Sequence, residues 1–171
     1  SVRDGRVFVG EKQAAPEPVP VRSEASRMVI VGGGAAGFAA AQMLRRQGFA
    51  GELVMFSSEQ TPPIDRPNLS KDYLAGSAPE DWLPMAGDDD YRRQNITLHL
   101  GRAVAAIDVT GRRVIDEAGA ARMVDRLLIA PGAEPRQLDI PGAGPDNVLL
   151  LRSLEDCRRI IARAQGAKRA V

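Results

Sequence analysis

Short apolar runs alternate with a glycine turn and an alanine-rich stretch early in the chain. Residues 27–31 (Arg-Met-Val-Ile-Val) and 52–57 are β-branched and aliphatic, which is typical of buried parallel strands. Residues 38–47 are rich in Ala and Leu, which favour a helix that ends at Gly48. The pattern is therefore strand, glycine turn, helix and strand, and it predicts a βαβ unit.

The end of the chain predicts a further helix. Residues 153–165 are expected to be helical, and Ser153 and Asp156 have the spacing of a capping box at its start. The pattern of strands and helices predicts the α/β fold class.

The first 25 residues lack this pattern. Residues 2–9 surround an Asp4-Gly5 dipeptide and predict a β-hairpin, which is too short to be a domain. The prolines of residues 11–25 predict an extended linker. We therefore expect residues 1–10 to be the tail of a preceding domain and residues 26–166 to be the main folded segment.

Composition and charge exclude several classes. With 44% hydrophobic and 26% charged residues, the chain resembles an ordinary globular protein, and no apolar run approaches the length of a membrane span. A net charge of +1 gives no electrostatic case for nucleic acid or membrane binding. One cysteine, Cys157, and one histidine, His99, argue against a disulfide framework or a metal centre and favour a reducing, cytoplasmic location.

The glycine turn, Gly32-Gly-Gly-Ala-Ala-Gly37, carries the clearest chemical signal. It fits G-x-G-x-x-G, in which Gly32 permits the tight turn, Gly34 lets the backbone approach a pyrophosphate and Gly37 lets the helix lie close to the strand. The amides that open the helix, at Ala35 and Ala36, are then expected to face the phosphates.

Glu59 is the acid expected at a ribose. It lies 22 positions after Gly37, about where a carboxylate reaches a ribose hydroxyl in dinucleotide sites. The alternative is that the turn is an ordinary βα turn that binds no ligand. The fingerprint alone does not separate NAD from FAD.

The next segment favours FAD. An Arg66-Pro67 corner leads into a short helix that Asn68 is expected to cap, and residues 66–71 have the sequence Arg-Pro-Asn-Leu-Ser-Lys. This resembles the R-P-x-L-S-K hallmark of the ferredoxin-reductase-like flavoproteins, a group within the pyridine nucleotide-disulfide oxidoreductases. The group contains rubredoxin reductases, the NADH-dependent reductases of aromatic-ring dioxygenases and apoptosis-inducing factor. The resemblance covers about residues 27–171.

The resemblance also implies how the strands are arranged. Residues 95–101 and 102–108 would pair as two strands, and residues 112–116 would continue a small antiparallel β-meander. Residues 127–130 would then return to the main sheet. The fold implied is a Rossmann-like three-layer α/β fold with an inserted β-meander.

The resemblance implies roles for further residues. Arg66 would contact the flavin, or else form a surface ion pair with Asp65 or Asp72. Lys71 would lie beside the isoalloxazine ring, or else be a solvated helix lysine. Val104 would contact the adenine through its backbone.

The turn at Ala130-Pro131-Gly132 stands where the family has A-T-G. Pro131 removes an amide donor and a hydroxyl, whereas the close backbone approach at Gly132 can survive. Arg152 would contact a flavin phosphate, although its capping-box segment has a structural reason to exist without a ligand. The expected cofactor-binding residues are Gly32, Gly34, Ala35, Ala36, Gly37, Glu59, Arg66, Lys71, Val104, Ala130, Gly132 and Arg152, with no catalytic or metal-ligating residue.

Four further features carry weaker signals. Trp82 either covers the flavin edge or packs within its loop. His99 and Cys157 are expected to be structural, and residues 88–90 (Asp-Asp-Asp) to cap a helix rather than bind a metal.

The function implied is that of the FAD-binding segment of an NAD(P)H-dependent oxidoreductase. Such a protein passes electrons from NAD(P)H through FAD to an iron–sulfur protein or domain, of the Rieske or ferredoxin type. Residues 1–10 look like the closing strands of a Rieske domain, and residues 167–171 like the first strand of an NAD(P)-binding domain. The segment is expected to be inactive alone and to self-associate through uncovered sheet edge. The alternatives are an NAD(P)-binding dehydrogenase domain and a non-catalytic interaction module.

Overall fold

The computed structural model describes residues 2–3, 6–7, 10 and 24–169. Strands β1 (Val2–Arg3) and β2 (Arg6–Val7) pair antiparallel, as expected for the hairpin. The Asp4-Gly5 turn lies outside the described residues, and so does the expected linker except for residues 24 and 25.

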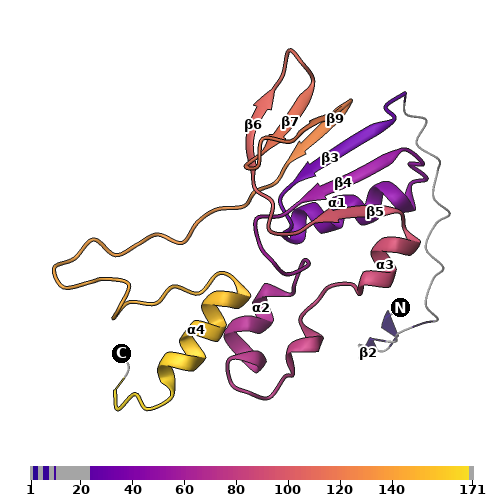
Figure 1. The fold of residues 1–171 in the computed structure, drawn as a ribbon. Coiled ribbons are helices and arrows are strands. Elements are labelled where there is room, and N and C mark those ends of the chain that lie inside the picture. The colour runs from indigo at the N-terminus through magenta and orange to yellow at the C-terminus, as the bar shows by residue number, and fades with distance from the viewer. Residues whose placement is uncertain (1, 4–5, 8–9, 11–23, 170–171) are drawn as a thin grey trace.

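The main sheet has four parallel strands in the order β5-β4-β3-β9 (Figure 1). The strands are β3 (Arg27–Val31), β4 (Glu52–Phe56), β5 (Ile96–His99) and β9 (Arg126–Ile129). Helix α1 (Ala35–Arg46) connects β3 to β4 and begins within the glycine turn, three residues before the expected start of the Ala- and Leu-rich helix. The predicted βαβ unit is confirmed.

Each face of this sheet is covered by a different layer. Helices α1 and α3 (Asp88–Arg93) pack on one face, where the core consists of Ile30, Ala41, Phe49, Leu53, Met55, Tyr91 and Ile96. A small antiparallel sheet of β6 (Val104–Asp108), β7 (Arg113–Asp116) and β8 (Ala121–Met123) packs on the other, around Val29, Val54, Phe56, Val114 and Val124. Because the side chains of a strand alternate between faces, Val29 and Ile30 belong to different cores.

One expectation about these strands is wrong, and one strand was missed. Residues 95–101 and 102–108 do not pair: β5 joins the parallel sheet beside β4, and β6 pairs with β7. Gly101, at φ +59°, turns the chain out of the main sheet between them. Strand β8 was not expected, because its three residues lack an apolar run.

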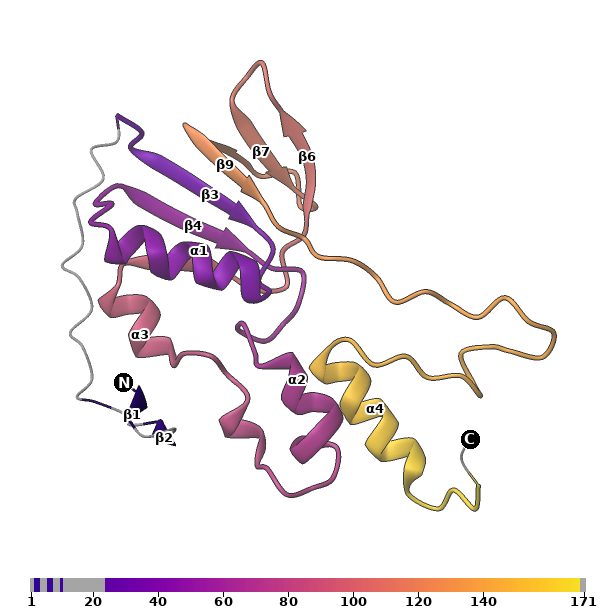
Figure 2. The same cartoon turned by 180° about the vertical axis from the view of Figure 1, so that it is seen from behind.

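A helical segment forms a separate group beside the sheet (Figures 1 and 2). It contains α2 (Arg66–Asn68), the π-turn η1 (Leu69–Tyr73), the 3₁₀ turn η2 (Glu80–Trp82) and α4 (Leu154–Ala164). Its core consists of Ile64, Leu69, Leu83, Leu154 and Cys157. In both views α4 lies beside α2, although a long irregular stretch of chain separates it from β9.

Of the helix caps expected from the sequence, the one at Ser153 is confirmed and the one at Asn68 is wrong. The capping box of α4 is confirmed, since Ser153 Oγ accepts from the Asp156 amide and Asp156 Oδ2 accepts from the Ser153 amide. Asp90 similarly accepts from the Gly87 amide at the start of α3. Asn68 does not cap a helix: it continues the helical chain, and its Oδ1 is buried without a hydrogen bond.

Cys157 and His99 lie in packed surroundings, whereas Trp82 is exposed. Cys157 is fully buried, as expected, and its thiol donates to the Leu69 carbonyl at 3.3 Å. His99 lies on β5 with its ring stacked on Phe56. Trp82 is 68% exposed, so it does not pack within its loop. No helix in the described part of the chain is both long and apolar enough to cross a membrane.

Candidate functional site

The glycine turn joins three elements through close backbone contacts. A Cβ atom at Gly32, which has φ +119°, would lie 2.0 Å from the carbonyl oxygen of Ala130 after β9. A Cβ at Gly37 would lie 2.0 Å from the carbonyl oxygen of Gly32 and 3.2 Å from Ile30 on β3. Only glycine fits either position, and α1 is thereby held against the ends of β3 and β9.

Gly34 faces open space instead. The nearest atom to a Cβ there would be Nη2 of Arg66, at 3.9 Å. Gly34 is the N-cap of the twelve-residue α1, and no side chain from the described residues caps this helix start. Ala35 and Ala36 are exposed. Amide groups and the positive end of a helix dipole therefore border unfilled space, an arrangement that suits a phosphate.

That space is a cavity of about 410 Å³ at the carboxyl ends of the parallel strands. Ligands of open α/β sheets bind at this edge. Of the expected cofactor-binding residues, the cavity is lined by Gly32, Gly34, Glu59, Arg66, Val104 and Arg152. We call it the strand-end cavity.

Glu59 and Arg66 form an ion pair within the strand-end cavity. Nη2 of Arg66 donates to Oε1 of Glu59, and both side chains are largely shielded from solvent. The partner of Arg66 is therefore neither Asp65 nor Asp72. The pair brings the expected ribose acid and the expected flavin-contacting arginine together beside the open glycine position.

Arg152 reaches the same cavity from the start of α4. Its Nη2 donates to the Pro131 carbonyl at 3.4 Å, and its Nε lies 3.6 Å from Glu134. A Cβ at Gly132 would lie 2.8 Å from Nη2 of Arg152. The lack of a side chain at Gly132 therefore leaves space for the Arg152 guanidinium, which donates to the Pro131 carbonyl.

A second cavity of about 410 Å³ continues from the first. It is lined by Arg66, Leu69, Ser70, Ala133, Glu134, Pro135, Leu151 and Arg152. Because Arg66, Glu134 and Arg152 line both spaces, the two form one groove from the strand ends to the helical segment. An extended dinucleotide needs a groove of this kind.

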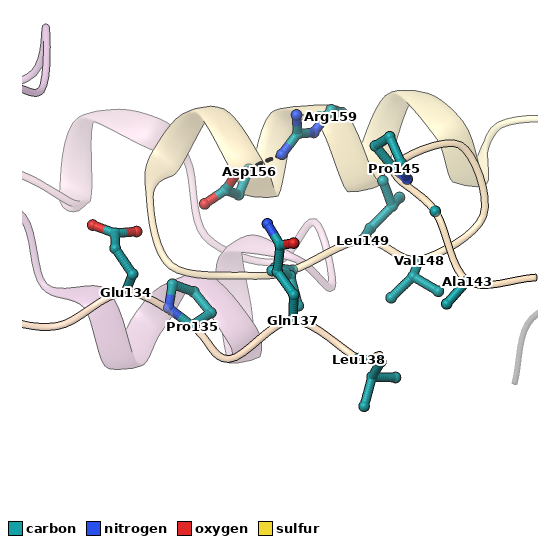
Figure 3. A pocket seen from close by; sticks show the side chains of 12 residues that line it. Glu134, Pro135, Gln137, Leu138, Ala143, Pro145, Val148, Leu149, Asp156 and Arg159 are labelled. Carbon is teal, nitrogen blue, oxygen red and sulfur yellow. Dashed lines mark hydrogen bonds and ion pairs between the residues drawn. The ribbon is translucent and has the colours of Figure 1, made fainter. Parts of the chain in front are cut away.

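A third cavity, of about 490 Å³, lies between α4 and the irregular stretch that precedes it (Figure 3). Apolar side chains such as Leu138, Val148 and Leu149 line it beside the Asp156–Arg159 ion pair. None of the expected cofactor-binding residues lines this cavity.

Several expected site residues do not line the groove: Ala35, Ala36, Gly37, Lys71, Ala130 and Gly132. All of these except Lys71 belong to the glycine turn or to the Ala130-Pro131-Gly132 turn, which border the groove, whereas Lys71 lies on η1. Lys71 is exposed, and its backbone (φ −118°, ψ −107°) interrupts the helical geometry of η1. Its place beside a flavin stays a prediction.

The strand-end cavity also contains residues that the sequence reasoning missed. Ser57 is buried at the end of β4, and a Cβ at Gly33 would lie 2.5 Å from its hydroxyl oxygen. Arg102 follows β5 and donates its amide to the Ser57 carbonyl at 2.7 Å. Both could have been found from their positions in the sequence, because each follows the carboxyl end of a parallel strand, where ligands of such sheets bind.

Charged side chains of both signs surround the strand-end cavity. Arg66, Arg102 and Arg152 line it, and so do Glu59, Glu134 and Asp156. Burial, together with the nearby charges of Arg122 and Arg102, lowers the pKa of His99 below its ordinary value. Burial alone would raise the pKa of Asp156, but hydrogen bonds from Ser153 and Arg152 hold it below its ordinary value.

Comparison with known proteins adds independent information. A family model described as pyridine nucleotide-disulphide oxidoreductase matches residues 26–171. The ferredoxin–NAD(+) reductase component of the p-cumate 2,3-dioxygenase system of Pseudomonas putida is 38% identical over 84% of this chain. Human apoptosis-inducing factor 3 is 33% identical over 84% of this chain.

A solved structure has the same fold. The covalent putidaredoxin reductase–putidaredoxin complex matches with a TM-score of 0.74 and 37% identity over 80% of this chain. The predicted fold class is thus confirmed. The chain spans only 35%, 23% and 33% of the lengths of these three proteins, in the order given.

Proposed function

Because the chain belongs to the pyridine nucleotide-disulphide oxidoreductase family, we propose that it forms the FAD-binding part of an NAD(P)H-dependent flavoprotein oxidoreductase. The observation that carries this proposal is the strand-end cavity, where Gly34, Glu59 and Arg66 meet. Open space at a glycine, an acid and a cation are the features that a dinucleotide's pyrophosphate and ribose require.

The residues present fit FAD along the whole groove. The turn at Gly34 and the amides of Ala35 and Ala36 would bind the pyrophosphate, and Glu59 the ribose hydroxyls. Val104 would contact the adenine, while Arg66, Arg152 and the second cavity would hold the flavin half. FAD, when bound, supplies the conversion of a two-electron hydride donor into single-electron transfers.

Binding requires the Glu59–Arg66 ion pair to rearrange. With FAD present, the Arg66 guanidinium can turn to a phosphate and the Glu59 carboxylate to a ribose hydroxyl. Each group then exchanges one charged hydrogen bond for another, so neither charge is left unpaired in the cavity.

The test is a titration of the chain with FAD and, separately, with NADH. We expect FAD to bind and to produce the visible absorption of an enclosed flavin. Gly34→Val should abolish this binding, since its side chain would fill the approach to the pyrophosphate. Gly144→Val is the matched control, because the nearest atom to a Cβ there also lies 3.9 Å away and Gly144 lines only the third cavity.

A chain that binds NADH but no FAD would instead support an NAD(P)-binding dehydrogenase domain. One that binds neither would support a non-catalytic interaction module. Equal FAD affinity in wild type and Gly34→Val would remove the glycine turn from the site.

We further propose an iron–sulfur protein as the electron acceptor, of the ferredoxin or Rieske type. The support is the names of the relatives, a ferredoxin–NAD(+) reductase component and a putidaredoxin reductase in complex with putidaredoxin. We expect no oxidation of NADH by the 171-residue chain alone in a dye-linked assay. Location in the cytoplasm stays a prediction.

Self-association through sheet edge is proposed from β9. Strand β9 pairs only with β3 among the described residues, and Leu128 and Ile129 on it are exposed. Unpaired strand edges with apolar side chains favour pairing with another chain. Light scattering over a range of concentrations should show a rising mass, and a constant monomer mass would contradict the proposal.

A further inference from the structure

The carboxyl ends of the four parallel strands form a row of fixed order. Along it lie the residues after β9 (130–132), the glycine turn after β3, residues 57–59 after β4 and residues 101–104 after β5. If the phosphates lie at the glycine turn and the ribose at Glu59, the next position in the row, after β5, receives the base.

The backbone after β5 is fixed against the end of β4. The Gly101 amide donates to the Glu59 carbonyl at 2.8 Å, and the Arg102 amide to the Ser57 carbonyl at 2.7 Å. Arg102, Ala103 and Val104 then line the strand-end cavity. This wall therefore has a set position relative to Glu59.

The side chain of Arg102 is ion-paired with Asp116 but is not hydrogen-bonded to it. Its Nη1 lies 3.7 Å from Oδ2 of Asp116, beyond hydrogen-bond distance, and its guanidinium makes no hydrogen bond within the described ranges of the chain. The side chain is 49% exposed. Its donors and its planar faces remain available to a ligand in the cavity.

Asp116 is built to orient Arg102. It is buried on β7, directly opposite Val104 on β6. Its Oδ1 accepts from the amides of Ala118 and Ala120, which leaves Oδ2 for Arg102. Oδ1 of Asp116 therefore binds the turn amides of Ala118 and Ala120, and Oδ2 faces the Arg102 guanidinium.

We propose that Arg102 is a further cofactor-binding residue, whose guanidinium packs against the adenine ring, and that Asp116 is its positioning residue. This inference rests on the proposed function. A guanidinium plane stacks on an aromatic ring and gains from its quadrupole, whereas an ammonium acts as a point charge. Adenine is the part of the dinucleotide that matches this contact.

The experiment measures the dissociation constants of FAD and ADP for the 171-residue chain by titration calorimetry. Arg102→Ala should weaken both ligands roughly tenfold, since both carry adenine. Arg102→Lys should remain several-fold weakened, because the charge is kept and the plane is lost. Arg113→Ala is the matched control: Arg113 is also 49% exposed and ion-paired, to Asp108, but does not line the cavity, so affinity should not change.

Asp116→Asn tests the positioning role. The variant keeps Oδ1 for the turn amides and loses the charge that faces Arg102, so FAD and ADP should bind several-fold more weakly. Added to Arg102→Ala, it should cause no further loss, whereas a merely structural role would give an additive one.

The outcomes separate this inference from the proposed function. Unchanged affinity in Arg102→Ala, or full recovery in Arg102→Lys, which would indicate a phosphate contact, overturns the role of Arg102 while FAD binding by the wild type stands. Unchanged affinity in Asp116→Asn overturns the positioning role. A wild-type chain that binds neither FAD nor ADP overturns both the proposed function and this inference.

Discussion

Two regions enclose the groove at the strand ends, and they are held together in different ways. The glycine turn packs backbone against backbone, with two positions where even one added carbon atom has no room. The helical segment that carries Arg66 is held instead by side chains far apart in sequence, such as Leu69 and Cys157. We infer that added side-chain volume at the glycine turn lowers the stability of the fold. In the helical segment, truncation of buried side chains should lower the stability, whereas polar substitutions at its surface should have little effect.

Gly32→Ala should break the first region most severely. The new Cβ would clash with the Ala130 carbonyl and would require a positive φ, so we expect a loss of about 4 kcal/mol in the free energy of unfolding. Urea denaturation followed by circular dichroism measures it. Gly119→Ala, with φ +82° and no atom within 4 Å, keeps only the backbone strain and should lose about 1 kcal/mol. Equal losses would refute the close-packing argument.

Leu69→Ala should break the core of the second region. Leu69 is fully buried among Leu83, Leu154 and Cys157, and its truncation should cost about 3 kcal/mol through lost burial and a cavity. The same denaturation assay applies. Leu138→Ala, at an exposed leucine of the irregular stretch, should change stability by less than about 0.5 kcal/mol. A small effect of Leu69→Ala would mean that the helical segment does not depend on its core.

A substitution at Asp125 tests how the stability of the parallel sheet depends on pH. Hydrogen bonds from Arg27, then from Ser26, hold the pKa of Asp125 well below its ordinary value and tie the start of β9 to β3. A carboxyl group with a lowered folded-state pKa stabilises the fold above its unfolded pKa, near about 4, and loses that contribution as the pH falls.

We therefore expect Asp125→Asn to lower the urea midpoint at pH 7, with the difference from wild type shrinking below about pH 4. Asp139→Asn, at an exposed acid whose side chain makes no hydrogen bond within the described ranges, should match wild type at both pH values. A difference for Asp125→Asn that persists at low pH would contradict the assignment.

Glu80→Gln should have the smallest effect and concerns the surface of the second region. Glu80 accepts from Tyr73 at 2.6 Å and is ion-paired with Arg158 on α4, but the charged pair is about half exposed. We expect a loss below about 1 kcal/mol, because water screens exposed ion pairs. Glu155→Gln, 3.5 Å from the same arginine and more exposed, should show no measurable change. A loss as large as that of Leu69→Ala would mean that polar contacts hold this region.

Much of the fold follows from local pattern. The strand, glycine turn and helix at residues 27–46, and the capping box at Ser153, depend on neighbours within a few residues, and each was predictable. Strand pairing was not predictable in the same way, because β5 pairs with β4 across several intervening elements, and β6 pairs with β7 in a different sheet. Asn68 failed as a cap since the helical chain begins before it.

The glycine turn, the βαβ unit around it and the resemblance of residues 66–71 could be identified from sequence, because each depends on residue type at short, fixed spacing. Tertiary packing was needed to bring Glu59 to Arg66, Arg152 to Gly132 and Arg102 to within 3.7 Å of Asp116. These neighbours come from separate elements. The order of strands in the sheet sets the distances between them, and that order depends on the packing of both faces rather than on any local run of residues.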